Sequence, residues 1–163
     1  MELWQRFSRN ARRAVLKANE RVLKAGGGEI TPEHLALGIL DLEQGSAWEM
    51  LQGMRVNIPK LREALVDAAA MVPKAPDEEV QFSPQTQRCI QTAYVEWQKH
   101  SASGASAPPG RERPHGGEDP PEKLRTIHLL LGLVAPASRC ECRTLIRHGV
   151  FYGEVSELLR RTK

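Results

Sequence analysis

The chain has 163 residues, enough for one ordinary domain or for two small units that share a core. Its 40% apolar and 26% charged residues are typical of a globular protein and exclude an intrinsically disordered chain. The formal charge is only +3, although arginines gather near both ends. Aromatic residues make up just 5% of the chain, and the periodic segments are rich in alanine and leucine, which favours helices over strands.

Four helices are predicted in the first half of the chain. The first begins at Ser8, whose hydroxyl can cap it, and ends at the glycines of residues 26–28. The second begins at residues 31–33, Thr-Pro-Glu, which supply a capping hydroxyl, a proline at the first helical position and an acid at the positive end of the helix dipole. The third is expected around residues 47–54 and the fourth around residues 57–68.

The same order of elements recurs in the second half of the chain. The Phe-Ser pair at residues 7–8 returns 75 positions later, at residues 82–83. A His-Leu-x-Leu-Gly motif begins at His34 and returns 94 positions later at His128, and the apolar positions that follow keep this second offset. The agreement indicates an internal duplication.

The difference between the two offsets indicates an insertion in the second copy, between Trp97 and His128. Residues 101–122 consist almost entirely of Pro, Gly, Ser and charged residues, so we expect a mobile loop there. The predicted organisation is a first four-helix repeat, a linker and a second repeat that contains this loop. Their limits are residues 1–72, 73–81 and 82–163.

The three cysteines are an odd number and suggest no disulfide framework. Cys89 lies on an apolar stripe and is predicted to be in the core. Cys140 and Cys142 would point to nearly opposite faces of a helix and could not share a metal ion. The arginine-rich N-terminal segment has no apolar run suited to a signal peptide or a membrane span. We therefore expect a cytoplasmic protein that has no metal ion, no cofactor and no membrane partner.

Two pairs of repeated residues are given structural roles. His34 and His128 are each followed by apolar residues and lack a serine or cysteine nucleophile in the same motif, so we interpret them as partly buried, hydrogen-bonded histidines. Gly38 and Gly132 lie inside predicted helices, where glycine costs about 1 kcal/mol relative to alanine. Close approach of another helix would explain both glycines.

Several motifs of the two repeats are shared with a known family. The first repeat reads Phe-Ser-x-x-Ala-x-x-Ala-Val at residues 7–15 and Thr-Pro-Glu-His-Leu-x-Leu-Gly-Ile-Leu at 31–40. The second reads Phe-Ser-Pro at 82–84, Thr-x-His-Leu-Leu-Leu-Gly-Leu at 126–133 and His-Gly-Val at 148–150. In these motifs the chain resembles the N-terminal domain of Clp unfoldases of the ClpC and ClpA type. The resemblance implies an all-α fold, with two tandem four-helix repeats packed about a pseudo-two-fold axis.

The resemblance also implies that the chain binds proteins and is not an enzyme. The expected partners are adaptors, unfolded or marked protein substrates, and Clp ATPase or protease subunits. No G-x-x-x-x-G-K-[ST] motif is present to hold a nucleotide triphosphate. The chain is therefore expected to be a free-standing version of the domain or the N-terminal fragment of a full-length Clp ATPase. A basic nucleic-acid or stress-associated binding protein that uses the arginines of residues 6–13 is a further alternative, although nucleic acid is not the expected partner.

The first set of candidate binding residues is Thr31 and Glu33 at the start of the second helix. In the ClpC subgroup the matching glutamates of both repeats receive the guanidinium of phosphorylated arginine, and a carboxylate can accept two parallel hydrogen bonds from that group. Glu33 keeps the acid in the first repeat, but Ile127 replaces it in the second. The resemblance therefore implies at most one such pocket. The alternative is that Glu33 only stabilises the helix dipole.

The second set of candidate residues is Trp4, Arg12 and Phe82. By resemblance, the starts of the first helices of the two repeats lie side by side and frame a groove for adaptors and small ligands. Tryptophan and arginine are common anchors of interfaces. The alternative for Trp4 is a hydrophobic staple that packs near Ser8. No residue is a candidate for catalysis, because the sequence offers neither paired acids at a catalytic spacing nor a set of metal ligands.

Overall fold

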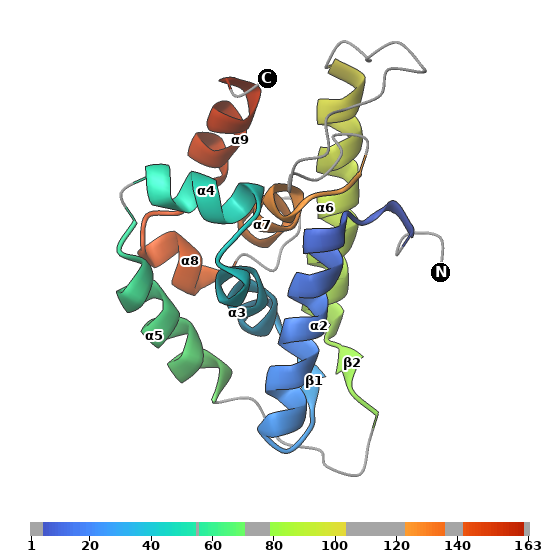
Figure 1. Cartoon of the computed structure of the whole chain (residues 1–163), viewed down its shortest axis with the longest axis vertical. Helices are drawn as coiled ribbons and strands as arrows, with labels where there is room; N and C mark the ends of the chain where they lie inside the picture. The colour runs from blue at the N-terminus through green and yellow to red at the C-terminus, as the bar shows by residue number, and fades with distance from the viewer. Residues whose placement is uncertain (1–4, 55, 71–78, 104–122, 136–141, 162–163) are drawn as a thin grey trace.

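Helices form most of the chain in the computed structural model, which describes residues 5–54, 56–70, 79–103, 123–135 and 142–161 (Figure 1). The described part confirms the predicted all-α class and the two tandem four-helix repeats. The helices of the first repeat are α2 (Arg9–Lys24), α3 (Pro32–Leu42), α4 (Ser46–Gly53) and α5 (Ile58–Ala69). Those of the second are α6 (Pro84–Ser103), α7 (Thr126–Val134), α8 (Arg143–Arg147) and α9 (Tyr152–Arg161).

The first helices of the two repeats begin with the same cap. The hydroxyl of Ser8 accepts a hydrogen bond from the backbone N–H of Ala11 at 3.1 Å, and that of Ser83 accepts one from Thr86 at 3.1 Å. These bonds satisfy N–H groups that would otherwise have no partner at the start of a helix. The repeated Phe-Ser motif is therefore a repeated helix start.

The second helices also begin alike, through their histidines. Nδ1 of His34 accepts the backbone N–H of Thr31 at 3.1 Å, and Nδ1 of His128 accepts that of Arg125 at 2.9 Å. Both histidines are buried, with 5% and 2% of their surface exposed. The predicted hydrogen-bonded role of the histidines is confirmed, and both are buried more deeply than the partial burial that was expected.

Gly38 and Gly132 mark close helix contacts in the two repeats. A Cβ atom on Gly38 would overlap the carbonyl oxygen of Ala14 in α2, and one on Gly132 would overlap that of Cys89 in α6. Only glycine permits backbones to approach this closely. The predicted close approach of another helix is confirmed, between α2 and α3 and between α6 and α7.

The two repeats exchange short extended segments. Strand β1 (Glu29–Ile30) precedes α3 and pairs in parallel with β2 (Gln81–Phe82), which precedes α6 (Figure 1). The reciprocal contact is a parallel bridge between Phe7, before α2, and Leu124, before α7. The backbone bonds match: Ser8 N–H donates to Leu124 O at 2.8 Å, and Ser83 N–H donates to Ile30 O at 3.0 Å. Each repeat thus completes the other in the same way, as a pseudo-two-fold arrangement requires.

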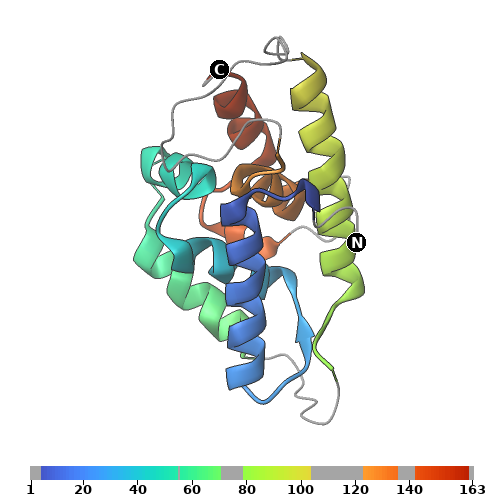
Figure 2. The same cartoon turned by 45° about the vertical axis from the view of Figure 1, so that its right-hand side comes forward.

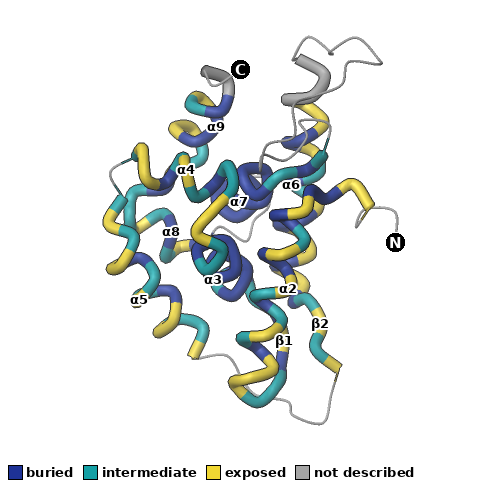
Figure 3. Tube along the Cα trace, in the orientation of Figure 1, coloured by how far each residue is buried: buried dark blue, intermediate teal, exposed yellow. Residues whose placement is uncertain are grey.

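Helices α3 and α7 form the centre of the core (Figure 3). Every residue of α7 is buried, and α3 is buried from Pro32 to Leu40 except for Glu33. Side chains from both repeats join one hydrophobic cluster. Burial of this apolar surface, at roughly 25 cal/mol per Å², is the main favourable term in the folding of such a domain.

The start of α4 and the start of α7 cap each other. Thr126 Oγ1 accepts the backbone N–H of Ala47 at 3.1 Å, and Ser46 Oγ accepts that of Ile127 at 3.2 Å. The two hydroxyl oxygens lie 3.3 Å apart. This exchange of caps joins the first repeat to the second in the interior, where an unsatisfied N–H would be costly.

Three expectations need amendment or lie outside the described residues. Helix α6 continues to Ser103, three residues into the segment 101–122 that was expected to be a loop, while residues 104–122 are not described. The limits of the repeats also stay predictions, because residues 71–78 are not described. Cys89 is buried as predicted but is disulfide-bonded, contrary to the expectation drawn from the odd cysteine count. Within the described segments, no helix has the length and apolar character needed to cross a membrane.

Candidate functional site

Glu33 lies in the first turn of α3, at the edge of the core. It is the one partly exposed residue between Pro32 and Leu40. Among the described residues its carboxylate has neither a hydrogen-bond nor an ion-pair partner. Burial lowers the pKa of His34 and raises that of Cys142, the cap residue of α8. The negative charge of Glu33 is a smaller influence, which opposes the first shift and adds to the second. The side chain of Glu33 is therefore partly exposed, and binding of a cationic ligand there stays a prediction.

The side chain of Thr31 forms part of the N-terminal cap of α3. Its hydroxyl oxygen lies 2.9 Å from Nδ1 of His34 and accepts the backbone N–H of His34 at 3.4 Å. A hydroxyl held in this way positions the start of α3. The contacts of Thr31 thus support a role in orienting the turn that carries Glu33, and direct ligand binding by Thr31 stays a prediction.

Unfolding stability should depend on pH through His34. Burial lowers the pKa of His34, and the opposing charge of Glu33 is a smaller influence. A lowered folded-state pKa means that the stabilisation is complete above the unfolded pKa of about 6.5 and is lost as the pH falls through the folded value. We expect the unfolding free energy from urea titration to decrease from pH 7 to pH 5, and to decrease less in His34→Gln. An equal slope in both proteins would assign the pH dependence to other groups.

The equivalent position in the second repeat offers no pocket. Ile127 is fully buried, and its backbone N–H is bonded to Ser46 of α4. A glutamate at residue 127 would place a carboxylate in the core rather than create a cation site, which is a costly change. The asymmetry between the repeats is therefore one of burial as well as of charge.

Arg12 and Phe82 are not brought together. Helix α2 runs away from the N-terminus towards β1, whereas α6 starts at β2 and runs in the opposite direction (Figures 1 and 2). Phe82 packs against Ala18, Val22 and Ile30, near the C-terminal half of α2. Arg12 lies in the N-terminal half, where its Nη2 donates to the carbonyl oxygen of Gln5 at 3.4 Å. The expectation that the starts of the two helices lie side by side is wrong. Trp4 lies outside the described residues.

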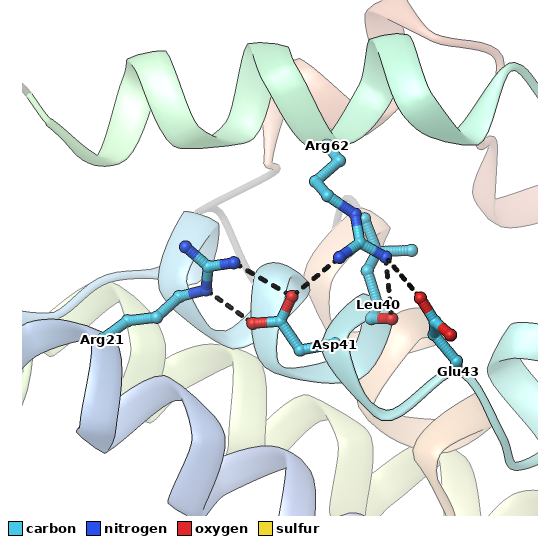
Figure 4. A network of polar contacts seen from close by, with 5 residues as sticks. All are labelled: Arg21, Leu40, Asp41, Glu43 and Arg62. Atoms are coloured by element: carbon cyan, nitrogen blue, oxygen red, sulfur yellow. Dashed lines mark hydrogen bonds and ion pairs between the residues drawn. The ribbon is translucent and has the colours of Figure 1, made fainter.

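An ion network that was not predicted from the sequence joins three helices of the first repeat (Figure 4). Asp41 at the end of α3 accepts two hydrogen bonds from Arg21 of α2, at 2.6 and 2.9 Å, and one from Arg62 of α5 at 3.0 Å. Arg62 also donates to the carbonyl oxygen of Leu40 at 3.1 Å. The bond to Asp41 raises the pKa of Arg21. These contacts hold α2 and α5 against α3, and they occupy both carboxylate oxygens of Asp41.

The fold and the repeated motifs agree with a match to a family of binding domains. The family model described as "Clp repeat (R) N-terminal domain" matches residues 6–106, more than half of the chain. The chain belongs to this family. Its domain is a protein-binding domain without catalytic activity, and the described residues contain no group of three side chains suited to a metal ion.

Two curated relatives are much longer than this chain. The chain is 24% identical over 150 residues to the chaperone protein ClpB of Oceanobacillus iheyensis. The aligned region covers 91% of the chain and 16% of ClpB. It is 31% identical over 93 residues to an uncharacterised protein of Mycobacterium tuberculosis. The aligned region covers 57% of the chain and 36% of that protein. The chain thus spans well under half the length of either relative.

Solved structures share the fold at low sequence identity. The N-domain of ClpV from Vibrio cholerae superposes with a TM-score of 0.73 at 16% identity, over 96% of this chain and 84% of that one. The N-terminal domain of ClpD from Arabidopsis thaliana superposes with a TM-score of 0.60 at 20% identity, over 98% of this chain and 99% of that one. A ClpV N-domain in complex with a VipB peptide superposes with a TM-score of 0.67 at 16% identity, over 96% of this chain and 86% of that one.

Proposed function

We propose that this chain is a protein-binding module of a Clp-type unfoldase and protease system, which recruits adaptors or substrates without hydrolysing ATP. The observation that carries the proposal is the family match over residues 6–106. The shared fold supports it, because a ClpV N-domain of this fold is known in complex with a VipB peptide. A cytoplasmic location suits such a role and stays a prediction.

Recovery of partners tests this function. The intact chain, immobilised and incubated with extract of its own cells, should retain a Clp ATPase or protease subunit, or an adaptor, that mass spectrometry identifies. If the ATPase modules belong to the same polypeptide, the native gene product will instead be longer than 163 residues. Retention of nucleic acid alone, with affinity that falls steeply as salt rises, would replace the proposal with the nucleic-acid alternative.

A finer proposal concerns what the first repeat recognises. The carboxylate of Glu33 is partly exposed, lies at the edge of the core and has no partner among the described residues. A guanidinium group could donate two parallel hydrogen bonds to it. We propose that Glu33 receives the guanidinium of a phosphoarginine residue on a marked substrate, and that the second repeat does not, because Ile127 is buried.

Calorimetric titration of phosphoarginine, and of an arginine-phosphorylated peptide, tests the role of Glu33. Glu33→Gln should weaken binding by about 1.5–3 kcal/mol, the range for hydrogen bonds to charged groups. The matched control is Glu49→Gln, which removes another first-turn acid, from α4, and should leave the affinity unchanged. No heat from the wild-type protein at millimolar ligand would retire the phosphoarginine proposal. Glu33 would then be a helix-dipole residue, and the protein-binding proposal would stand.

A further inference from the structure

Two exposed leucines lie on one face of α2. Leu16 and Leu23 are 53% and 57% exposed, the highest values among the large apolar side chains of the described residues. They are seven positions apart, so they lie on the same side of the helix, two turns from one another. The remaining exposed large apolar side chains of the described residues, Val66, Val95 and Phe151, lie on three different segments. Only α2, within the described part, presents such a pair.

The same helix is strongly basic. Its sixteen residues include six basic side chains and one acid, although the whole chain has a net charge of only +3. We call its exposed residues the outer face of α2, and they are Arg9, Arg13, Leu16, Glu20, Leu23 and Lys24. The opposite side of α2 packs on α3, and no described helix covers the outer face (Figure 2). The face therefore combines apolar contacts with an unbalanced positive charge.

We propose that the outer face of α2 docks an amphipathic, acidic helix of a partner protein. Two leucines seven residues apart match one heptad of a facing helix, whose own apolar residues would repeat at the same spacing. Aspartate and glutamate on the flanks of that helix would lie opposite Arg9, Arg13 and Lys24, as charge complementarity requires. The inference rests on the proposed protein-binding function and identifies a surface that is separate from Glu33.

A second copy of the chain fits this face less well. Two copies of α2 in contact would bring their arginines and lysines together, and Glu20 is the single acid of the helix. Like charges opposed across an interface disfavour association. An acidic helix provides the same apolar contact and removes this repulsion.

The probe for this proposal is a synthetic, helix-stapled, glutamate-rich peptide with leucines seven residues apart, titrated into the intact chain by fluorescence anisotropy. We expect saturable binding that weakens as the salt concentration rises. The double substitution Leu16→Ser, Leu23→Ser should weaken binding at least about tenfold, because it removes both of the large apolar side chains that the peptide would bury. Val66→Ser is the control: it removes another exposed apolar side chain, 40% exposed, from α5, and should leave the affinity unchanged.

Further measurements test which ligand the outer face of α2 recognises. A peptide of the same composition with its leucines scrambled, and a lysine-rich peptide with the leucine spacing kept, should both bind at least about tenfold more weakly. Equal binding of the scrambled peptide, or wild-type affinity in the Leu16, Leu23 double variant, would overturn the proposal. So would a duplex DNA that binds the face more tightly than the acidic peptide, or concentration-dependent self-association in sedimentation that the double variant abolishes.

The same variants separate this inference from the proposed function. Leu16 and Leu23 are exposed, so the double variant should keep the melting temperature of the wild type, and a loss of binding then reports on the surface. If the double variant recovers the Clp partner from extract as well as the wild type and also binds the acidic peptide normally, only the α2 surface is withdrawn. If the wild type recovers no protein partner at all, the proposed function itself fails.

Discussion

Substitution of Gly38 by alanine is expected to lower the melting temperature of the chain by roughly 6–12 °C, from a loss of about 3 kcal/mol in unfolding free energy. The added Cβ would overlap the carbonyl oxygen of Ala14 and lie 3.2 Å from the backbone nitrogen of Ala18. Both obstacles are backbone atoms of α2, so the clash can be relieved only by moving α2 away from α3. Differential scanning calorimetry measures the change.

The second repeat and a matched glycine provide the comparison. Gly132→Ala should destabilise the chain to a similar extent, because its Cβ would overlap Cys89 O and lie 3.0 Å from the backbone nitrogen of Ala93. Gly53→Ala in α4 meets no atom within 4 Å and should be neutral or stabilising by up to about 1 kcal/mol. If all three substitutions have the same effect, the close approach of the helices is not the reason for the two core glycines.

Asp41→Asn is expected to lower the unfolding free energy by about 1.5–3 kcal/mol in urea titration. Asp41 is 16% exposed and bonded to two arginines. Removal of its charge leaves Arg21 without an anionic partner among the described residues, and leaves Arg62 with only the exposed Glu43. Because the side chains of Arg21 and Arg62 are 33% and 31% exposed, water replaces part of what is lost.

The control for Asp41 lies in the same network. Glu43 is 66% exposed and lies 3.7 Å from Arg62, so Glu43→Gln should change the stability by less than about 0.5 kcal/mol. Equal effects of the two substitutions would mean that the network acts only as a screened surface pair and does not hold α2, α3 and α5 together.

Much of the fold could be predicted because the two repeats provide independent copies of the same signals. Ser8 and Ser83 carry side chains that cap helices through local hydrogen bonds, so each helix start is visible in the residues themselves. Gly38 and Gly132 recur at one offset inside helices, where glycine is unfavourable, and that cost pointed to a neighbouring backbone.

The rest depends on contacts between distant residues that local patterns do not encode. Arg125 stands at the cap of α7 without a side chain of the usual capping type, so the sequence there lacked the signal that Thr31 provides. The bonds of Asp41 to Arg21 and Arg62 cross 20 and 21 positions and require the packed helices to exist first. The opposite directions of α2 and α6 follow from the pairing of Phe82 with Ile30, which no local pattern indicates. Of the candidate site, Thr31 and Glu33 were indicated by their place in a motif, and their role in binding stays a prediction.

The exchanged segments make the chain equivalent to an isologous dimer whose two protomers have been joined end to end. In such a dimer the two subunits contact each other through the same surface. Here Ile30 of the first half pairs with Phe82 of the second, and Leu124 of the second half pairs with Phe7 of the first. Neither half can unfold without leaving backbone groups and helix caps of the other half without partners. The chain should therefore unfold as one cooperative unit, and either half expressed alone should lack a stable fold. Mixed in solution, the two halves would be expected to reassemble as a heterodimer.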